Sequence, residues 1–222
     1  AEGRQAIANF NVASYRARYA DLRSAFGNNL KAYYDHYRIN GYAEGRVATG
    51  STELQNPTTV YNGVDYKLVY DYNYYINKYP DIKAAFNGDE NATLRHFVEC
   101  GMNEGRQGKA SFNVAAYRAN YADLRSAFGR NLKAYYMHYI GSGYREGRKA
   151  TGNGVLKNPV TVYNGVDYSL VYDYNYYISK YSDLKAAFYG DDTAALRHFV
   201  ECGMNEGRQA KDSFNVKKYK NR

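Results

Sequence analysis

The chain has 222 residues, and its 30 Lys and Arg exceed its 22 Asp and Glu, which favours an acidic partner. The charges are interspersed without a run of five basic residues, so we expect a solvated basic surface and no nucleic-acid site. No apolar stretch reaches the roughly 18 residues of a membrane span, which predicts no membrane insertion. Cys100 and Cys202 occupy equivalent positions of a repeat, so we expect them to lie farther apart than the roughly 7 Å between Cα atoms that a disulfide allows, which predicts free thiols. They also lack zinc-site spacing, which predicts no metal.

The chain repeats itself. Residues 10–111 recur as residues 112–213 without insertion or deletion, and 78 of the 102 aligned positions are identical. A period of this kind predicts a repeat array that buries surface mainly between neighbouring units. The chain opens on Glu2-Gly3-Arg4, a mark that elsewhere ends a unit, and closes on Phe214, which elsewhere begins one. We therefore expect a piece of a longer repeat protein.

Each period contains two related helical units, because residues 10–46 align without gaps on residues 70–106. Asn11 is expected to cap a first helix that carries Tyr15 and Tyr19 on one face. The pair Tyr79-Pro80 is expected to end that helix in the second unit and to open the next one, since proline is tolerated only in a first turn.

A third helix is expected after a second cap at Asn29 or Asp89, with Gly41 or Gly101 as the residue that follows its C-terminus. The Glu-Gly-Arg mark then closes each unit. We interpret it as a structural lock, in which the glycine turns the chain and the arginine pairs with a carboxylate.

A β-hairpin is predicted in every second connection. Residues 60–66 and 162–168 both read VYNGVDY, which places Asn-Gly between β-favouring residues. The expected fold is therefore mainly α, a tandem array of short three-helix units with a hairpin inserted in every second connection. The expected modules are residues 1–50 (partial, one helical unit), 51–152 (complete) and 153–222 (partial).

The sequence offers no pattern for catalysis. The four histidines, His36, His96, His138 and His198, occupy one repeat position without neighbouring ligands, so we interpret them as structural residues bonded to nearby backbone. No glycine-rich phosphate loop or nucleophile motif occurs. We expect no enzyme, no catalytic residue, no cofactor and no metal.

Tyrosine is more abundant than the core of such a module is expected to require, with 28 residues against 9 Phe and no Trp. Six rings crowd into and after the hairpin, more than a thin module is expected to bury, and exposed tyrosine is typical of binding surfaces. The predicted ligand-binding residues are Tyr61, Tyr66, Tyr70, Tyr72, Asn73 and Tyr74, with Tyr163, Tyr168, Tyr172, Tyr174, Asn175 and Tyr176 in the second copy.

The run VYNGVDYKLVYDYNYYINKYPDIKAAF, followed by LRHFVECGMNEGRQ, resembles the tandem tyrosine-rich modules of large secreted or wall-attached proteins of gut Firmicutes. Proteins similar to this include immunoglobulin-binding B-cell superantigens of gut commensals, which engage antibody heavy-chain variable domains. The resemblance implies an extracellular location and a host protein as partner.

These observations favour a non-enzymatic, multivalent binding module of a bacterial secreted or surface protein. Two alternatives stay open. The first is a module that anchors to cell-wall glycan or teichoic acid through tyrosine stacking and the basic excess, and the second is a passive spacer repeat.

Overall fold

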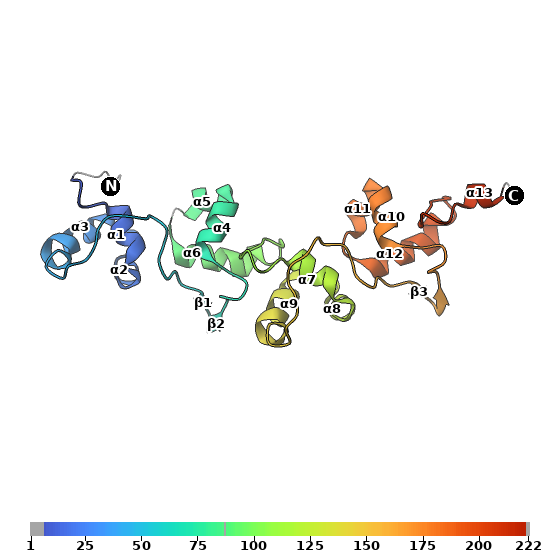
Figure 1. Ribbon diagram of the computed structural model, residues 1–222, viewed down its shortest axis with the longest axis horizontal. Helices are drawn as coiled ribbons and strands as arrows, with labels where there is room; N and C mark the ends of the chain where they lie inside the picture. The colour runs from blue at the N-terminus through green and yellow to red at the C-terminus, as the bar shows by residue number, and fades with distance from the viewer. Residues whose placement is uncertain (1–6, 87, 221–222) are drawn as a thin grey trace. The chain divides into compact units, whose positions relative to one another are not determined.

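The computed structural model describes residues 7–86 and 88–220, where short helices dominate and two small antiparallel hairpins interrupt them (Figure 1). The predicted mainly helical fold with hairpins is confirmed. The chain divides into two compact units, one formed by residues up to Gly101 with Gly108–Ala110, the other by Met102–Gln107 with residues from Ser111 onward. The predicted module limits stay a prediction, and the Glu2-Gly3-Arg4 mark lies outside the described residues.

Each compact unit holds two helical units with a hairpin in the connection between them. The first unit runs α1 (Val12–Arg18), α2 (Ala20–Phe26), α3 (Leu30–His36), η1 (Tyr37–Gly41), β1 (Val60–Tyr61), β2 (Val64–Asp65), α4 (Tyr72–Lys78), α5 (Pro80–Phe86), α6 (Glu90–His96) and η2 (Phe97–Gly101), where η denotes a π-helical turn.

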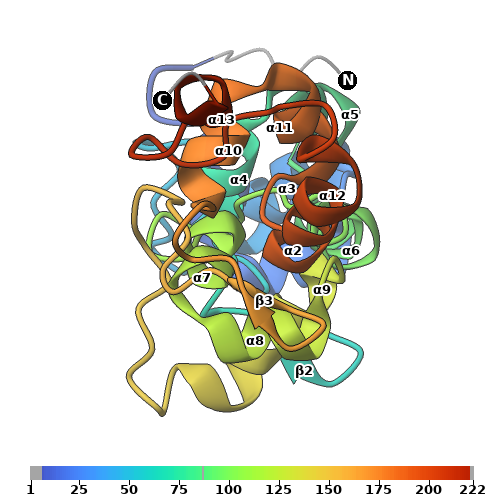
Figure 2. The same cartoon turned by 90° about the vertical axis from the view of Figure 1, so that its right-hand side faces the viewer.

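The second unit repeats this order. It runs α7 (Val114–Asn120), α8 (Ala122–Phe128), α9 (Leu132–His138), η3 (Tyr139–Gly143), β3 (Val162–Tyr163), β4 (Val166–Asp167), α10 (Tyr174–Lys180), α11 (Ser182–Phe188), α12 (Asp192–His198), η4 (Phe199–Gly203) and α13 (Val216–Lys220). Helices α10, α11 and α12 lie side by side in both views and contact one another pairwise (Figure 2).

The predicted N-terminal caps and the predicted junction at Tyr79-Pro80 are confirmed. The Asn11 side chain accepts a hydrogen bond from the Ser14 backbone at 3.0 Å, and Asn29 caps α3 in the same way. Tyr79 is extended between α4 and α5, and Pro80 is the first residue of α5. Helices of two turns are marginal alone in water, so packing within the unit must stabilise them.

A buried tyrosine at the centre of each helical unit explains the recurrent histidine and glycine. The Tyr15 hydroxyl lies 2.9 Å from His36 Nδ1, and a Cβ on Gly41 would lie 2.1 Å from the same hydroxyl oxygen. The histidine is structural, but it bonds a tyrosine side chain and not the backbone. Gly41 lies in η1 and is needed because the ring approaches it closely, so its predicted role after the helix end is wrong.

The Glu-Gly-Arg mark forms the expected lock. Gly45 has φ +67°, and Arg46 pairs with Glu44 at 2.5 Å and with Asp21 at 2.8 Å. The Arg46 guanidinium also lies 4.8 Å from the ring centre of Tyr19. The turn at Gly45, the ion pairs of Arg46 and its contact with the Tyr19 ring therefore hold the end of the helical unit against its middle helix.

The hairpins are confirmed at both predicted places. Val60 pairs with Asp65 and Tyr61 with Val64, while Asn62 and Gly63 take φ of 48° and 78°. Two successive residues with positive φ make a turn whose twist matches that of antiparallel strands. Among the described residues, the helices are all too short or too polar to span a membrane.

Candidate functional site

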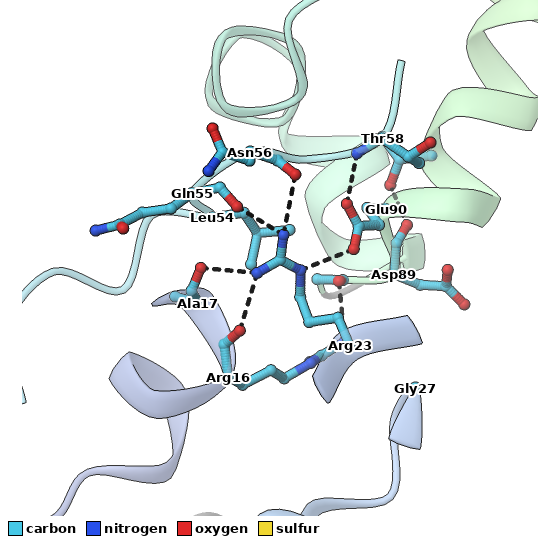
Figure 3. A network of polar contacts seen from close by, with 12 residues as sticks. Arg16, Ala17, Arg23, Gly27, Leu54, Gln55, Asn56, Thr58, Asp89 and Glu90 are labelled. Atoms are coloured by element: carbon cyan, nitrogen blue, oxygen red, sulfur yellow. Dashed lines mark hydrogen bonds and ion pairs between the residues drawn. The ribbon is translucent and has the colours of Figure 1, made fainter. Parts of the chain in front are cut away.

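Arg23 is the buried residue that joins the two helical units of the first compact unit (Figure 3). Its side chain is 3 % exposed, and its Nε donates to Glu90 of α6 at 2.7 Å. The guanidinium also donates to the carbonyl oxygens of Ala17 at 2.8 Å and Gln55 at 2.7 Å, among others. The second Glu90 oxygen accepts from the Thr58 backbone at 2.7 Å. The connection before the hairpin is thereby held between α2 and α6.

The second compact unit contains the same arrangement with a shorter acid. Arg125 donates to Asp192 at 3.2 Å, to the Ala119 carbonyl at 3.1 Å and to the Lys157 carbonyl at 2.8 Å. Asp192 accepts from the Val160 backbone at 3.0 Å. Because both side chains are buried and bonded to each other and to backbone of the connection, this pair serves the fold.

The hairpin lies against the last helix of the same compact unit. The Tyr61 hydroxyl donates to Glu99 at 2.5 Å, and this hydrogen bond raises the pKa of Tyr61. Val60 is 56 % exposed beside it. We define the hairpin face as Val60, Tyr61, Val64, Arg95 and Glu99, with its counterpart Val162, Tyr163, Val166, Arg197 and Glu201. It combines apolar area with one charge of each sign.

Burial overturns part of the sequence-based expectation about tyrosine. Tyr66 is 4 % exposed, and Tyr70 and Tyr72 are 1 % exposed each, so their predicted exposure is wrong. Their counterparts Tyr172 and Tyr174 are equally buried. The rings form the core: Tyr70 packs on Phe97 with ring centres 5.0 Å apart. Short helices leave space that only large side chains fill, so the module buries more rings than expected.

The remaining predicted residues divide between structure and surface. Asn73 does not frame a ligand patch, because its side chain accepts from Leu54 N at 3.2 Å and donates to Leu54 O at 2.9 Å. Asn175 clamps Leu156 in the same way. The partly exposed predicted residues are Tyr61, Tyr74, Tyr163, Tyr168 and Tyr176. Sequence reasoning missed Arg95 and Glu99, which follow the hairpin motif only after two helices and recur in the second copy as Arg197 and Glu201.

Differences between the two copies avoid the hairpin face. Residues 59–66 and 94–107 are identical to residues 161–168 and 196–209, although Val60, Arg95 and Glu99 are exposed. The equivalent turn at the end of the first helical unit in each compact unit is not identical between the copies. Residues 35, 38–40 and 43 all differ from residues 137, 140–142 and 145. Since both are ends of the same kind of helical unit, stability of that unit does not account for the identity.

The described residues form no metal site. Among residues 7–86 and 88–220, no group of three or more His, Cys, Asp or Glu could hold a metal ion. The thiols of Cys100 and Cys202 are free, as predicted, and exposed. No known protein family, curated protein or solved structure matches the chain.

Proposed function

We propose that the chain is a non-enzymatic, multivalent protein-binding array of a secreted or wall-attached bacterial protein, with one hairpin face in each compact unit as its binding surface. The observation that carries the proposal is the identity of the exposed hairpin face in two copies whose other exposed turns have diverged. The bond between Tyr61 and Glu99 serves the fold, but the exposed Val60 and Arg95 have no such role, so their identity in both copies supports constraint by a contact with a partner.

The partner we propose is an antibody heavy-chain variable domain, on the resemblance to commensal immunoglobulin-binding proteins. The hairpin face suits a protein partner because it combines the ring of Tyr61 and the exposed Val60 with Arg95 and Glu99, the composition of a contact patch with a polar rim. Two linked faces raise apparent affinity roughly 10² to 10⁴-fold over one face when their spacing fits the target.

The test is binding of polyclonal Fab and of whole immunoglobulin to the immobilised chain. The variant Val60→Glu with Val162→Glu places a charge in each face at positions 56 % and 53 % exposed, so the fold is retained and Fab retention is lost. The matched control is Tyr42→Ser with Tyr144→Ser, at positions 71 % and 57 % exposed outside the hairpin face, which leaves binding unchanged. Absence of Fab binding by the unaltered chain refutes the antibody assignment.

A wall-anchoring function gives a different pattern in parallel assays. The chain then sediments with purified walls that carry teichoic acid, and raised salt releases it because the attraction is between the basic surface and an anionic polymer. A passive spacer binds neither Fab nor walls.

A further inference from the structure

A hollow of about 420 Å³ adjoins the hairpin face of the first compact unit. Val60 and Tyr61 of strand β1, residues of helix α6, and Asn28 between α2 and α3 line it. The Arg23–Glu90 pair also lines it. The hollow is therefore built from both helical units and the hairpin, and a partner seated on the hairpin face would cover it.

The hollow has a net positive charge, because three arginines (Arg16, Arg23 and Arg95) and two carboxylates (Asp89 and Glu90) line it. Both Glu90 oxygens are taken, by Arg23 and by the Thr58 backbone. Asp89 accepts from the Ala92 backbone as the cap of α6. Arg95 lines the hollow, is exposed, and makes no hydrogen bond or ion pair with the described part of the chain.

Arg16 lines the same hollow from α1. It is held there by Asn28, whose side-chain oxygen accepts from the guanidinium at 2.6 Å, and by the Gly88 carbonyl at 3.0 Å. Its Nε is buried and finds no hydrogen-bond acceptor among the residues that the structure describes. A carboxylate entering between Arg16 and Arg95 would meet two guanidinium groups, which bind carboxylates with charge-assisted hydrogen bonds.

The second compact unit differs at this place. The exposed hairpin face is identical, but Arg130 stands where the first unit has Asn28, and Thr193 stands where it has Asn91. Arg130 donates to Asp191 at 3.0 Å and to the Ala187 carbonyl, so its side chain bridges the two helical units. The corresponding bridge in the first unit is a single 3.4 Å contact from Asn28 to Asp89.

We infer that the two hairpin faces bind one protein partner unequally: the first also takes a carboxylate side chain of the partner, Asp or Glu, into the hollow between Arg16 and Arg95, whereas Arg130 bridges that place in the second. The inference rests on the proposed function in one respect: it takes the carboxylate to be a side chain of a protein partner. The chemistry of the hollow is tested without any antibody.

The experiment is a nuclear magnetic resonance titration of the full chain with N-acetylglutamate, with N-acetylglutamine as the neutral control. The expected result is saturable shifts at the amides of Asn28 and Asn91 and at Arg95 Nε, with an affinity about tenfold higher than at Arg130 and Arg197. Roughly tenfold corresponds to one net charge-assisted hydrogen bond at a partly exposed site. The neutral amide gives no such shifts.

Two exchanges between the copies complete the test. Asn28→Arg removes the preference of the first unit, and Arg130→Asn creates it in the second, while the other resonances report that the fold is intact. Equal shifts in both units, no shifts, or equal shifts with N-acetylglutamine overturn the inference. Loss of Fab binding with retained carboxylate binding would instead overturn only the proposed function.

Discussion

Removal of the Arg23 guanidinium is expected to lower the stability of the first compact unit and to leave that of the second unchanged. The variant Arg23→Met keeps the length of the side chain but leaves Glu90 buried without its cation, and Glu90 has an 11 % exposed side chain. Breaking a buried ion pair from one side costs about 3 to 5 kcal/mol, because an uncompensated charge remains in the interior. Carbonyl oxygens such as those of Ala17 and Gln55 also lose a donor.

A loss of this size is a large part of the 5 to 15 kcal/mol that stabilises an ordinary domain. We expect urea unfolding of Arg23→Met to separate into two transitions, and hydrogen exchange to show early opening of the first compact unit, whereas the second stays protected. The counterpart Arg125→Met reverses the order. Arg95→Met removes an exposed guanidinium that has no such contacts and serves as control.

The reasoning also predicts how Arg23 and Glu90 couple. Glu90→Asp is tolerated with a loss under about 1 kcal/mol, since the second unit uses Asp192 against Arg125 at 3.2 Å. The double variant Arg23→Met with Glu90→Leu recovers about 2 kcal/mol or more relative to the sum of the single losses, because both charges are gone. A loss below about 1 kcal/mol for Arg23→Met, or equal loss in both units, would refute the reasoning.

Three further outcomes are expected. Gly41→Ala destabilises its unit by about 1 to 3 kcal/mol, since the new Cβ would lie 2.1 Å from the Tyr15 hydroxyl, and Tyr15→Phe recovers part of the loss in thermal unfolding. Tyr70→Phe and Tyr172→Phe raise the unfolding free energy by about 1 kcal/mol each, because both hydroxyls are buried and have no hydrogen-bond partner among the residues that the structure describes; a loss in either variant contradicts this. Burial raises the pKa of Tyr72 to about 12, above the unfolded value, so its contribution to stability is full below about pH 10 and falls as the pH rises toward 12. The measurement is the difference in tyrosinate absorbance between the unaltered chain and Tyr72→Phe; a difference that appears near about pH 10 while the chain is still folded would disprove it.

The sequence by itself predicted the local structure because the contacts that make it span few residues. The Asn11 cap reaches only to Ser14, and the turn at Asn62 and Gly63 depends on the backbone freedom of those two residues. The extended Tyr79 followed by Pro80 is also a local matter, set by the ring of proline. The signals for these elements lie within a few residues of one another, so their recognition needs no knowledge of the fold, although packing is needed to stabilise the helices.

The tertiary structure alone decided which tyrosines are core and which positions meet across the repeat. Tyr72 and Tyr74 are two residues apart on one helix, yet the first is buried and the second partly exposed, because one side of α4 faces the other helices of its compact unit. Arg23 and Glu90 lie 67 positions apart, and the recurrence of Arg at 125 with an acid at 192 was the only trace of their pairing in the sequence. Burial and long-range pairing depend on contacts between residues that are far apart in the sequence. The repeat pattern shows which positions recur, but it does not show which of them contact one another.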